Sequence, residues 1–314
     1  MESITILGAG IASQVLIKKL RQENASCKIS LIDKNNYYFP REDFISRPGD
    51  ISRKIDLEQW TQSLGVEFIN DKVQRVDPHR KKIYLRQNQV REFKKLIVAT
   101  GLISKKMTIK GEHREGFSYL SDIDPLKLRG FLRISSEICV YVSTWLGLRL
   151  AISLASLGKE VKIVSYSLDF LGQEKIRIID LLNEKKISLY MNSFIEEAVG
   201  EGMIKAVKIS PLKVFSSQMV FIDSGFSPNA TFFEEEVKLH ETFFTDFEDI
   251  YFLGDINNQD IEKEVSFTSN YENAKQQATI FSEFLLKGTR PDISSLVRVE
   301  DNTKINIDKI LQGG

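Results

Sequence analysis

A glycine-rich segment near the N-terminus contains the first residues whose types and spacing predict chemistry. The segment Gly8–Ser13 (GAGIAS) follows the apolar run Ser3–Leu7 and precedes Gln14–Gln22, which has helical periodicity. A strand, a glycine turn and a helix in this order bind the pyrophosphate of a dinucleotide. Gly8 permits the tight turn, and Gly10 lets the phosphates approach the backbone, where the N–H groups of the helix N-terminus attract their charge.

An acidic residue follows the next predicted strand. The apolar run Lys28–Ile32 ends at Asp33, 20 residues after Ser13, the small residue in the third glycine position. A carboxylate at this spacing accepts hydrogen bonds from the ribose of a dinucleotide. The alternative is an ordinary strand–helix–strand turn in which Asp33 is a loop residue. The glycine turn and the acid together favour a dinucleotide.

A second strand–turn–helix unit begins at Glu137 and lacks most of these features. Its predicted strand, Glu137–Val142, is followed by a turn that ends at Gly147, by a helical segment and by the strand Val161–Ser165. Only the third glycine position is kept, because Val142 and Thr144 occupy the first two. Both are β-branched and resist a positive φ, so we expect their side chains to crowd a pyrophosphate. The second strand also ends without the acid that holds a ribose, and binding of NAD(P)H to this unit stays open.

Composition and charge exclude several other classes of protein. The 314 residues are 42% hydrophobic and 27% charged, and 43 basic residues balance 43 acidic ones. The length predicts two domains, and the charge lacks the basic excess that favours nucleic acid or an anionic membrane. Two cysteines and three histidines show no dithiol or metal-ligand spacing, so we expect no metal site. No run resembles a signal peptide or a membrane span, so we expect a cytoplasmic protein.

Four later segments resemble the motifs of one flavoprotein family. They are Leu96–Gly101 (LIVATG), Val220–Asn229 (VFIDSGFSPN), Ile250–Asp255 (IYFLGD) and Tyr271–Ala278 (YENAKQQA). With the glycine turn and Asp33, they follow the order found in the FAD-dependent pyridine nucleotide-disulfide oxidoreductase superfamily, over about residues 1–290. The resemblance implies an α/β fold of two Rossmann-like three-layer domains, one inserted in the other. Residues 1–107 and 238–290 would form a discontinuous FAD-binding domain, 108–237 an NAD(P)H-binding-like domain, and 291–314 a short C-terminal tail.

The redox-active cysteines of several branches of this superfamily are absent. The chain has neither a cysteine pair in the first helix region nor a cysteine near residue 40. The segment Asn36–Arg41 (NYYFPR) instead resembles the PYYRPR segment of NADH:rubredoxin reductases and related ferredoxin-type reductases, with Phe39 in place of an arginine. Only Ser294–Ile310 resembles the start of the C-terminal domain of such relatives, so we expect no full C-terminal interface domain.

The resemblance also implies which residues contact the cofactor. The candidate FAD-binding residues are Gly8, Gly10, Ala12, Ser13, Asp33, Lys34, Arg41, Val73, Ala99, Thr100, Gly101, Gly254 and Asp255. The candidate catalytic residues are Trp145, Arg149 and Arg41. Trp145 either stacks near the isoalloxazine or packs at a domain boundary. Arg149 either stabilises an anionic reduced flavin or is a solvated helix residue, and Arg41 either faces the flavin or caps a turn.

Two functions follow from the resemblance. The first is an FAD-dependent oxidoreductase that passes electrons through the flavin from NAD(P)H or a protein donor to a small electron carrier, without a redox-active disulfide. The alternative is a non-catalytic or partner-dependent FAD-binding subunit whose NAD(P)H site is lost. The expected cofactor is FAD, and the expected partner is a small rubredoxin- or ferredoxin-type protein or a larger complex.

Overall fold

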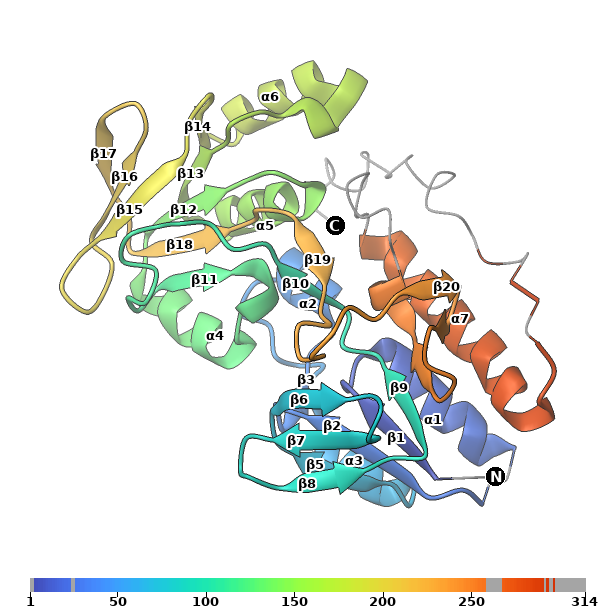
Figure 1. Cartoon of the computed structure of the whole chain (residues 1–314). Coiled ribbons are helices and arrows are strands. Elements are labelled where there is room, and N and C mark those ends of the chain that lie inside the picture. The colour runs from blue at the N-terminus through green and yellow to red at the C-terminus, as the bar shows by residue number, and fades with distance from the viewer. Residues whose placement is uncertain (1–2, 24–25, 258–266, 291, 294–295, 297–314) are drawn as a thin grey trace.

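The computed structural model contains two largely parallel β-sheets, each covered on both faces by other elements (Figure 1). The structure describes residues 3–23, 26–257, 267–290, 292–293 and 296. Most of the predicted tail 291–314, including nearly all of Ser294–Ile310, therefore lies outside the described residues. No helix in the described ranges has the length and apolar character needed to cross a membrane.

The first sheet has the N-terminal strand near its centre. Its strand order is β20 (Leu239–Glu241), β21 (Phe244–Thr245), β22 (Ile250–Phe252), β9 (Lys95–Val98), β1 (Ile4–Leu7), β2 (Ile29–Asp33) and β5 (Glu67–Asn70). The strands from β22 to β5 are parallel. Such a sheet places the carboxyl ends of β1, β2 and β9 at one edge, where the loops that follow them meet.

Alternating side chains of the first sheet pack into two different layers. Ile4 and Ile6 contact α1 (Ile11–Gln22) and α7 (Phe267–Lys287) on one face, whereas Leu7 belongs to the core on the other face. That second layer is the antiparallel sheet of β6 (Val73–Asp77), β7 (Lys82–Leu85) and β8 (Val90–Glu92). We call this sheet, its helices and β6–β8 the first unit. Because strand residues alternate between faces, the apolar run of β1 fills both layers.

The second sheet repeats this plan. Its strand order is β11 (Phe117–Tyr119), β18 (Met219–Ile222), β12 (Glu137–Tyr141), β13 (Glu160–Val164) and β14 (Ser188–Tyr190), all parallel. One face packs on α4 (Pro125–Ile134), α5 (Trp145–Ser156) and α6 (Lys175–Glu184). The other face packs on the antiparallel sheet of β15 (Ile195–Val199), β16 (Ala206–Ile209) and β17 (Lys213–Ser216). We call these elements the second unit, and together the two units confirm the predicted α/β fold with two Rossmann-like three-layer domains.

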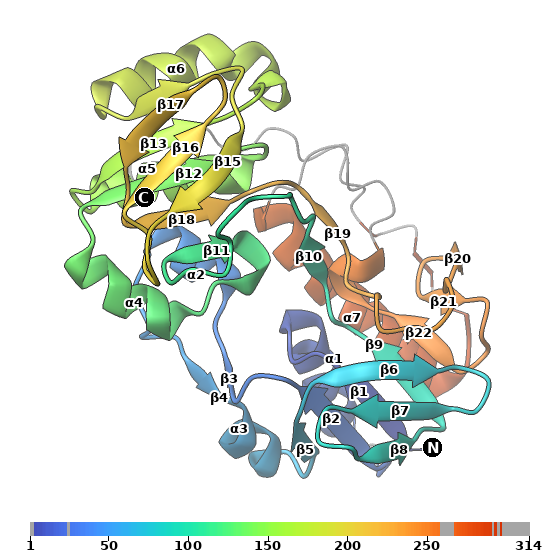
Figure 2. The ribbon, with the colours of Figure 1, turned by 60° about the vertical axis from the view of Figure 1, so that its left-hand side comes forward.

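Two short strands join the units. β10 (Leu102–Ser104) leads the chain out of the first unit, β19 (Phe226–Pro228) leads it back, and the two pair antiparallel (Figure 2). α2 (Arg41–Ser46) lies against α5, and its Phe44 and Ile45 pack in the core of the second unit. The division of the chain at residues 107 and 238 stays a prediction.

The remaining elements are short connections. They are β3 (Tyr37–Tyr38), β4 (Ile55–Asp56) and α3 (Leu57–Ser63), and the 3₁₀ turns η1 (Leu120–Asp122), η2 (Asp169–Glu174) and η3 (Gly254–Asn257). The sequence predicted both strand–turn–helix units close to their observed bounds. The helices, however, begin earlier than expected, α1 at Ile11 and α5 at Trp145, because both start directly after the second position of the glycine motif.

Candidate functional site

The glycine turn after β1 has two glycines with different physical roles. Gly8 has φ +93°, and a Cβ there would lie 2.6 Å from the carbonyl oxygen of Ala99, so the turn itself requires glycine. Gly10 has φ −65°, and a Cβ there would meet only the Ala99 oxygen, at 3.8 Å. The chain therefore leaves room beside Gly10 that the turn does not need.

The N-terminus of α1 has no side-chain cap. Gly10 is the N-cap residue, no side chain among the described residues caps the helix there, and the first turn contains no acidic residue. Ser13 is fully buried, and its hydroxyl donates back to the carbonyl oxygen of Gly8. The N–H groups of an uncapped first turn, together with the positive end of the helix dipole, suit an external anion such as a pyrophosphate.

Asp33 lies at the end of β2, next to this turn. Its Oδ2 accepts a hydrogen bond from the Ala9 N–H at 2.8 Å, and its Oδ1 accepts one from the Asn35 N–H at 2.8 Å. Burial raises the pKa of Asp33, and these N–H groups and the charge of exposed Lys34 oppose the rise. Asp33 thus positions the glycine turn, and its contact with a ribose stays a prediction.

A second group of candidates gathers around η3. Gly254 has φ +80°, and a Cβ there would lie 3.0 Å from the Cβ of Ala12. The Gly254 N–H donates to Oε1 of Gln277 on α7 at 2.8 Å. This turn therefore approaches α1 closely, which requires small residues at both positions.

Arg41 and Asp255 carry opposite charges that interact. Burial raises the pKa of Asp255 to about 6, and the Arg41 charge opposes the rise. Burial lowers the pKa of Arg41, and the Asp255 charge opposes that change. The structure thus brings the start of α2 to the start of η3, although more than half of the chain separates them.

The other predicted cofactor residues lie in two places. Ala99 is buried beside Gly8. Thr100 donates its hydroxyl to the Asn229 carbonyl at 2.6 Å, and the Asn229 N–H donates to the Gly101 carbonyl at 2.9 Å, so these residues fasten the two connections between the units. Val73 begins β6 and packs in the core on the face of the sheet opposite α1.

Two predicted catalytic residues lie at the start of α5. Trp145 is 6% exposed and packs its ring edge-on against Phe170, with 5.9 Å between ring centroids. Arg149 donates from Nη2 to the hydroxyl of Ser46 at 3.1 Å, and so links α5 to α2. The structure thus gives Trp145 a core contact and Arg149 an inter-helix contact, and the catalytic roles of both stay predictions.

Asp223, which was not among the candidates, dominates the turn of the second unit. It is fully buried directly after β18. Its Oδ2 accepts hydrogen bonds from the N–H groups of Ser143 at 3.2 Å, Thr144 at 2.7 Å and Gly147 at 3.2 Å, and from the Thr144 hydroxyl at 2.9 Å. The signal in the sequence was an acid directly after the buried strand in VFIDSG.

Val142 does not supply the crowding expected of it. Its side chain is fully buried in the core with α5. Thr144 adopts an extended conformation, φ −138° and ψ 169°, and caps α5 by accepting a hydrogen bond from the Leu146 N–H. The group that fills the turn is the Asp223 carboxylate, which comes from a different strand.

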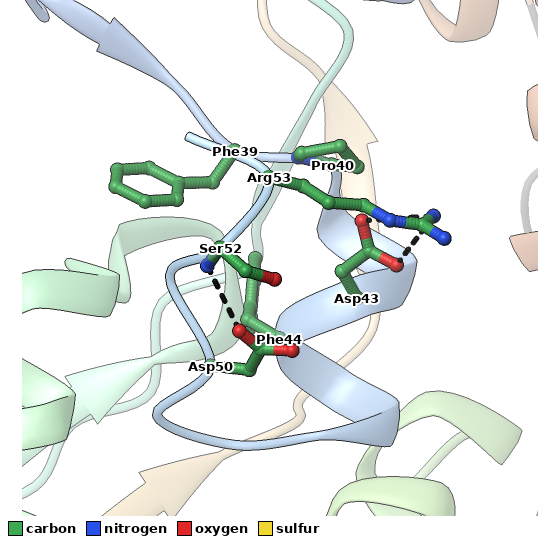
Figure 3. A pocket seen from close by; sticks show the side chains of 7 residues that line it. All are labelled: Phe39, Pro40, Asp43, Phe44, Asp50, Ser52 and Arg53. Carbon is green, nitrogen blue, oxygen red and sulfur yellow. Dashed lines mark hydrogen bonds and ion pairs between the residues drawn. The ribbon is translucent and has the colours of Figure 1, made fainter. Parts of the chain in front are cut away.

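A shallow surface hollow lies beside α2 (Figure 3). It is lined by Phe39, Pro40, Asp43, Phe44, Asp50, Ser52 and Arg53. Arg53 donates to Asp43 at 3.1 Å and the Ser52 N–H donates to Asp50 at 2.8 Å, so neighbouring side chains and backbone satisfy its charged groups (Figure 3). Within the described residues, no group of three or more His, Cys, Asp or Glu side chains is placed to hold a metal ion.

The amino-acid sequence is similar to those of known proteins. The family model described as pyridine nucleotide-disulphide oxidoreductase matches residues 2–278. The chain is 25% identical over 252 residues to human apoptosis-inducing factor 3, covering 74% of this chain and 40% of the relative. It is 26% identical over 273 residues to NADH-rubredoxin oxidoreductase of Clostridium acetobutylicum, covering 81% of this chain and 67% of the relative.

Solved structures share the fold. A ferredoxin reductase of Rhodopseudomonas palustris superposes with a TM-score of 0.73 at 20% identity, over 92% of this chain and 77% of that one. At this level of identity the similarity shows the fold alone. The chain spans about 40% of the length of apoptosis-inducing factor 3, the first curated relative it matches.

Proposed function

The chain belongs to the pyridine nucleotide-disulphide oxidoreductase family, and on this premise we propose that it is an FAD-dependent oxidoreductase whose first unit binds FAD. The family resemblance based on six motifs in sequence order is thereby confirmed. Bound FAD supplies hydride and single-electron chemistry, while the protein binds it, orients it and sets its electrostatic surroundings. The first unit corresponds to residues 1–107 and 238–290 in this proposal, and the second unit to 108–237.

One observation carries the proposal, namely the uncapped N-terminus of α1. The N-cap of α1 is Gly10, without a side-chain cap, and the described part of the chain leaves the space beside Gly10 open. A helix N-terminus without a partner is costly unless water or a ligand satisfies its N–H groups. The first unit thus keeps both the charge and the space that the FAD pyrophosphate needs.

The remaining residues fit the two ends of the same cofactor. Asp33 would hold the adenosine ribose, because its carboxylate already lies against the turn that receives the pyrophosphate. Gly254, Asp255 and Arg41 would hold the flavin end, and the Arg41 charge there favours negative charge on the ring.

The cysteines support electron transfer without a redox-active disulfide. Cys27 and Cys139 are free and buried, and burial raises the pKa of Cys139, so this side chain stays a thiol. Electrons would therefore leave the flavin directly, for a small iron carrier of the rubredoxin or ferredoxin type. The names of two of the relatives, a rubredoxin oxidoreductase and a ferredoxin reductase, support this class of acceptor.

A second candidate function is favoured by Asp223. Its buried carboxylate lies at the N-terminus of α5, where a dinucleotide unit receives its pyrophosphate. The chain would then be an FAD-binding subunit that takes electrons from a protein partner, because its NAD(P)H site is lost.

An anaerobic titration separates the two functions. The purified protein is first examined for a yellow flavin spectrum, then mixed with NADH or NADPH, and then with dithionite. Bleaching by a pyridine nucleotide supports the NAD(P)H-dependent reductase, and bleaching by dithionite alone supports the partner-dependent subunit. Return of the yellow colour on adding oxidised rubredoxin or ferredoxin supports the proposed acceptor. A colourless protein that stays empty with excess FAD contradicts both functions.

A further inference from the structure

We propose that the Asp223 carboxyl group occupies the phosphate position of the second unit and thereby excludes pyridine nucleotides from it. The inference rests on the proposed function in one respect, since it takes the second unit to be the pyridine nucleotide unit of the family. It assigns the loss of the site to one side chain and does not depend on whether the flavin turns over.

Matching backbone hydrogen bonds place Asp223 where the first unit has Ala99. The Ala99 N–H donates to the Leu7 carbonyl at 2.8 Å, and the Asp223 N–H donates to the Tyr141 carbonyl at 3.0 Å. Leu7 and Tyr141 are the last residues of β1 and β12, the strands that lead into the two turns. The segment Asp223-Ser224-Gly225 thus corresponds to Ala99-Thr100-Gly101.

The turns themselves also correspond. The Gly8 N–H donates to the carbonyl of Ile32 on β2 at 2.9 Å, and the Val142 N–H donates to the carbonyl of Val164 on β13 at 2.9 Å. Gly10 and Thr144 are then the N-cap residues of α1 and α5. Because the two turns follow the same path, a phosphate would meet the same part of each helix.

The Asp223 carboxylate makes the contacts that a phosphate oxygen would make there. Its Oδ2 accepts N–H groups from Ser143 and Thr144 in the turn and from Gly147 in the first turn of α5. Backbone N–H groups at a helix N-terminus are the donors that bind a dinucleotide pyrophosphate. In the second unit they are already satisfied by a carboxyl oxygen from the chain itself.

Gly147 has a different explanation in this arrangement. A Cβ at this position would lie 2.5 Å from Oδ2 and 2.6 Å from the Cβ of Asp223. The glycine is therefore needed to admit the aspartate, and its presence does not indicate a working dinucleotide motif. The corresponding Ser13 of the first unit keeps a side chain, because Ala99 leaves space for it.

The second carboxylate oxygen indicates a role other than stability. Oδ1 of Asp223 is buried and has no hydrogen-bond partner among the described residues. A buried unpaired oxygen destabilises the fold, and such groups are rare in native proteins. An apolar or small residue here would avoid this cost. We therefore infer that the aspartate is present because it excludes a pyridine nucleotide.

The test measures binding of ADP-ribose, which contains the pyrophosphate of a pyridine nucleotide and cannot reduce the flavin. Isothermal calorimetry on the FAD-loaded protein is expected to show no saturable binding to the wild type at millimolar concentration. Asp223→Ala should bind at least about 100-fold more tightly, because the carboxyl group no longer occupies the N–H groups and the space that the phosphates need. Using FAD-loaded protein keeps the first unit occupied, and the flavin spectrum confirms that it stays so.

Two further variants make the result decisive. Asp223→Ser is smaller than aspartate but keeps a hydroxyl that accepts a hydrogen bond from the α5 N-terminus, so it should gain binding even where the alanine variant is poorly folded. Ser224→Ala, at the neighbouring position, should bind no better than the wild type.

Two outcomes would overturn the proposal. One is saturable binding of ADP-ribose to the wild type, and the other is a folded, FAD-loaded Asp223→Ala or Asp223→Ser protein that gains none. Reduction of the flavin by NADH in these variants tests the proposed function separately, since ADP-ribose binding does not depend on it.

Discussion

The two units share a backbone path and treat the N-terminus of their first helix in opposite ways. In the first unit Ala99 is small, Gly10 provides no cap, and the N–H groups of α1 are open to a ligand. In the second unit Asp223 satisfies the corresponding groups of α5. The comparison predicts that one residue at the end of a neighbouring strand decides whether a Rossmann-like turn receives a phosphate.

We expect the largest effect, on FAD affinity, from placing an aspartate at the N-terminus of α1, as Asp223 lies at the N-terminus of α5. Ala99→Asp, combined with Ser13→Gly to admit the side chain as Gly147 does in the second unit, places a carboxylate at the N-terminus of α1, in the position that Asp223 has. We expect FAD affinity to fall by at least about 100-fold, because the carboxylate and the pyrophosphate compete for the same N–H groups. The flavin-to-protein ratio after purification and calorimetry with added FAD measure the loss.

Ala99→Ser with the same Ser13→Gly change is the matched control for this variant. Serine is small and uncharged, so it should keep FAD to within a few-fold of the wild type. Normal FAD binding by a folded Ala99→Asp protein would break the comparison, since it would mean that an acid at this position does not exclude a phosphate.

The next largest effects distinguish Gly10 from Gly8, because we expect one substitution to lower FAD affinity and the other to lower stability. Gly10→Ala should leave the unfolding free energy of the flavin-free protein within about 0.5 kcal/mol of the wild type, because its Cβ meets only one atom of the chain, at 3.8 Å. Its FAD affinity should fall about 10-fold, because the Cβ enters the space of the pyrophosphate.

Gly8→Ala should show the reverse pattern. Its Cβ would lie 2.6 Å from a backbone oxygen at φ +93°, so the fold itself should lose about 1–3 kcal/mol. Chemical denaturation and FAD titration of both variants check the pair. Equal loss of stability in the two variants would show that the space beside Gly10 is not reserved for a ligand.

Local patterns explain why the first unit was largely predictable. The strand Ile4–Leu7, the glycine turn and Asp33 are close in sequence, so alternation, helical periodicity and motif spacing specify them together. The two parallel sheets followed from the same kind of pattern repeated along the chain. Helix starts were less accurate, because both begin inside the glycine motif.

The decisive contact of the second unit was not predictable in this way. Asp223 reaches Thr144 only because β18 pairs with β12, which brings together residues that are far apart in the chain. The sequence showed β-branched residues in the turn, and these were expected to crowd the site. The side chain that does so comes from a strand whose register no local pattern specifies. Arg149 and Ser46 met for the same reason, through the packing of α2 on α5.

The flavin end of the first unit should show a smaller effect that depends on pH. The pKa of Asp255 is raised from 3.8 to about 6, so the folded state holds its proton more strongly than the unfolded state does. Stability of the flavin-free protein should therefore fall as pH rises from about 4 to about 6 and stay level above that range. We expect the fall to be about 1 kcal/mol, below the roughly 3 kcal/mol of the full shift, because Asp255 is half-buried and solvent screens part of the effect.

Asp255→Asn removes the titrating group and should flatten this part of the profile. Denaturation of both proteins between pH 4 and about pH 8 tests the sign. Burial also raises the pKa of Asp33 and of Asp223, so the contribution of Asp255 is the difference between the profiles of the two proteins. A profile unchanged by the substitution would show that the Arg41 charge fully offsets the burial of Asp255.

The smallest effect concerns the contact between the units. Arg149→Ala removes a hydrogen bond from α5 to Ser46 on α2, and should lower the unfolding free energy by about 0.5–1 kcal/mol. Ser46→Ala is the matched variant, and the double variant should lose less than the sum of the two, because both single changes remove the same bond. We expect unchanged rates of flavin reduction by dithionite. A slower rate in Arg149→Ala, without coupling to Ser46, would instead support the catalytic role predicted from the sequence. α2 also carries Arg41, which lies at the flavin end of the first unit, at its start. Coupling without a change in rate would therefore mean that the second unit, although closed to nucleotides, holds α2 in place for the first unit.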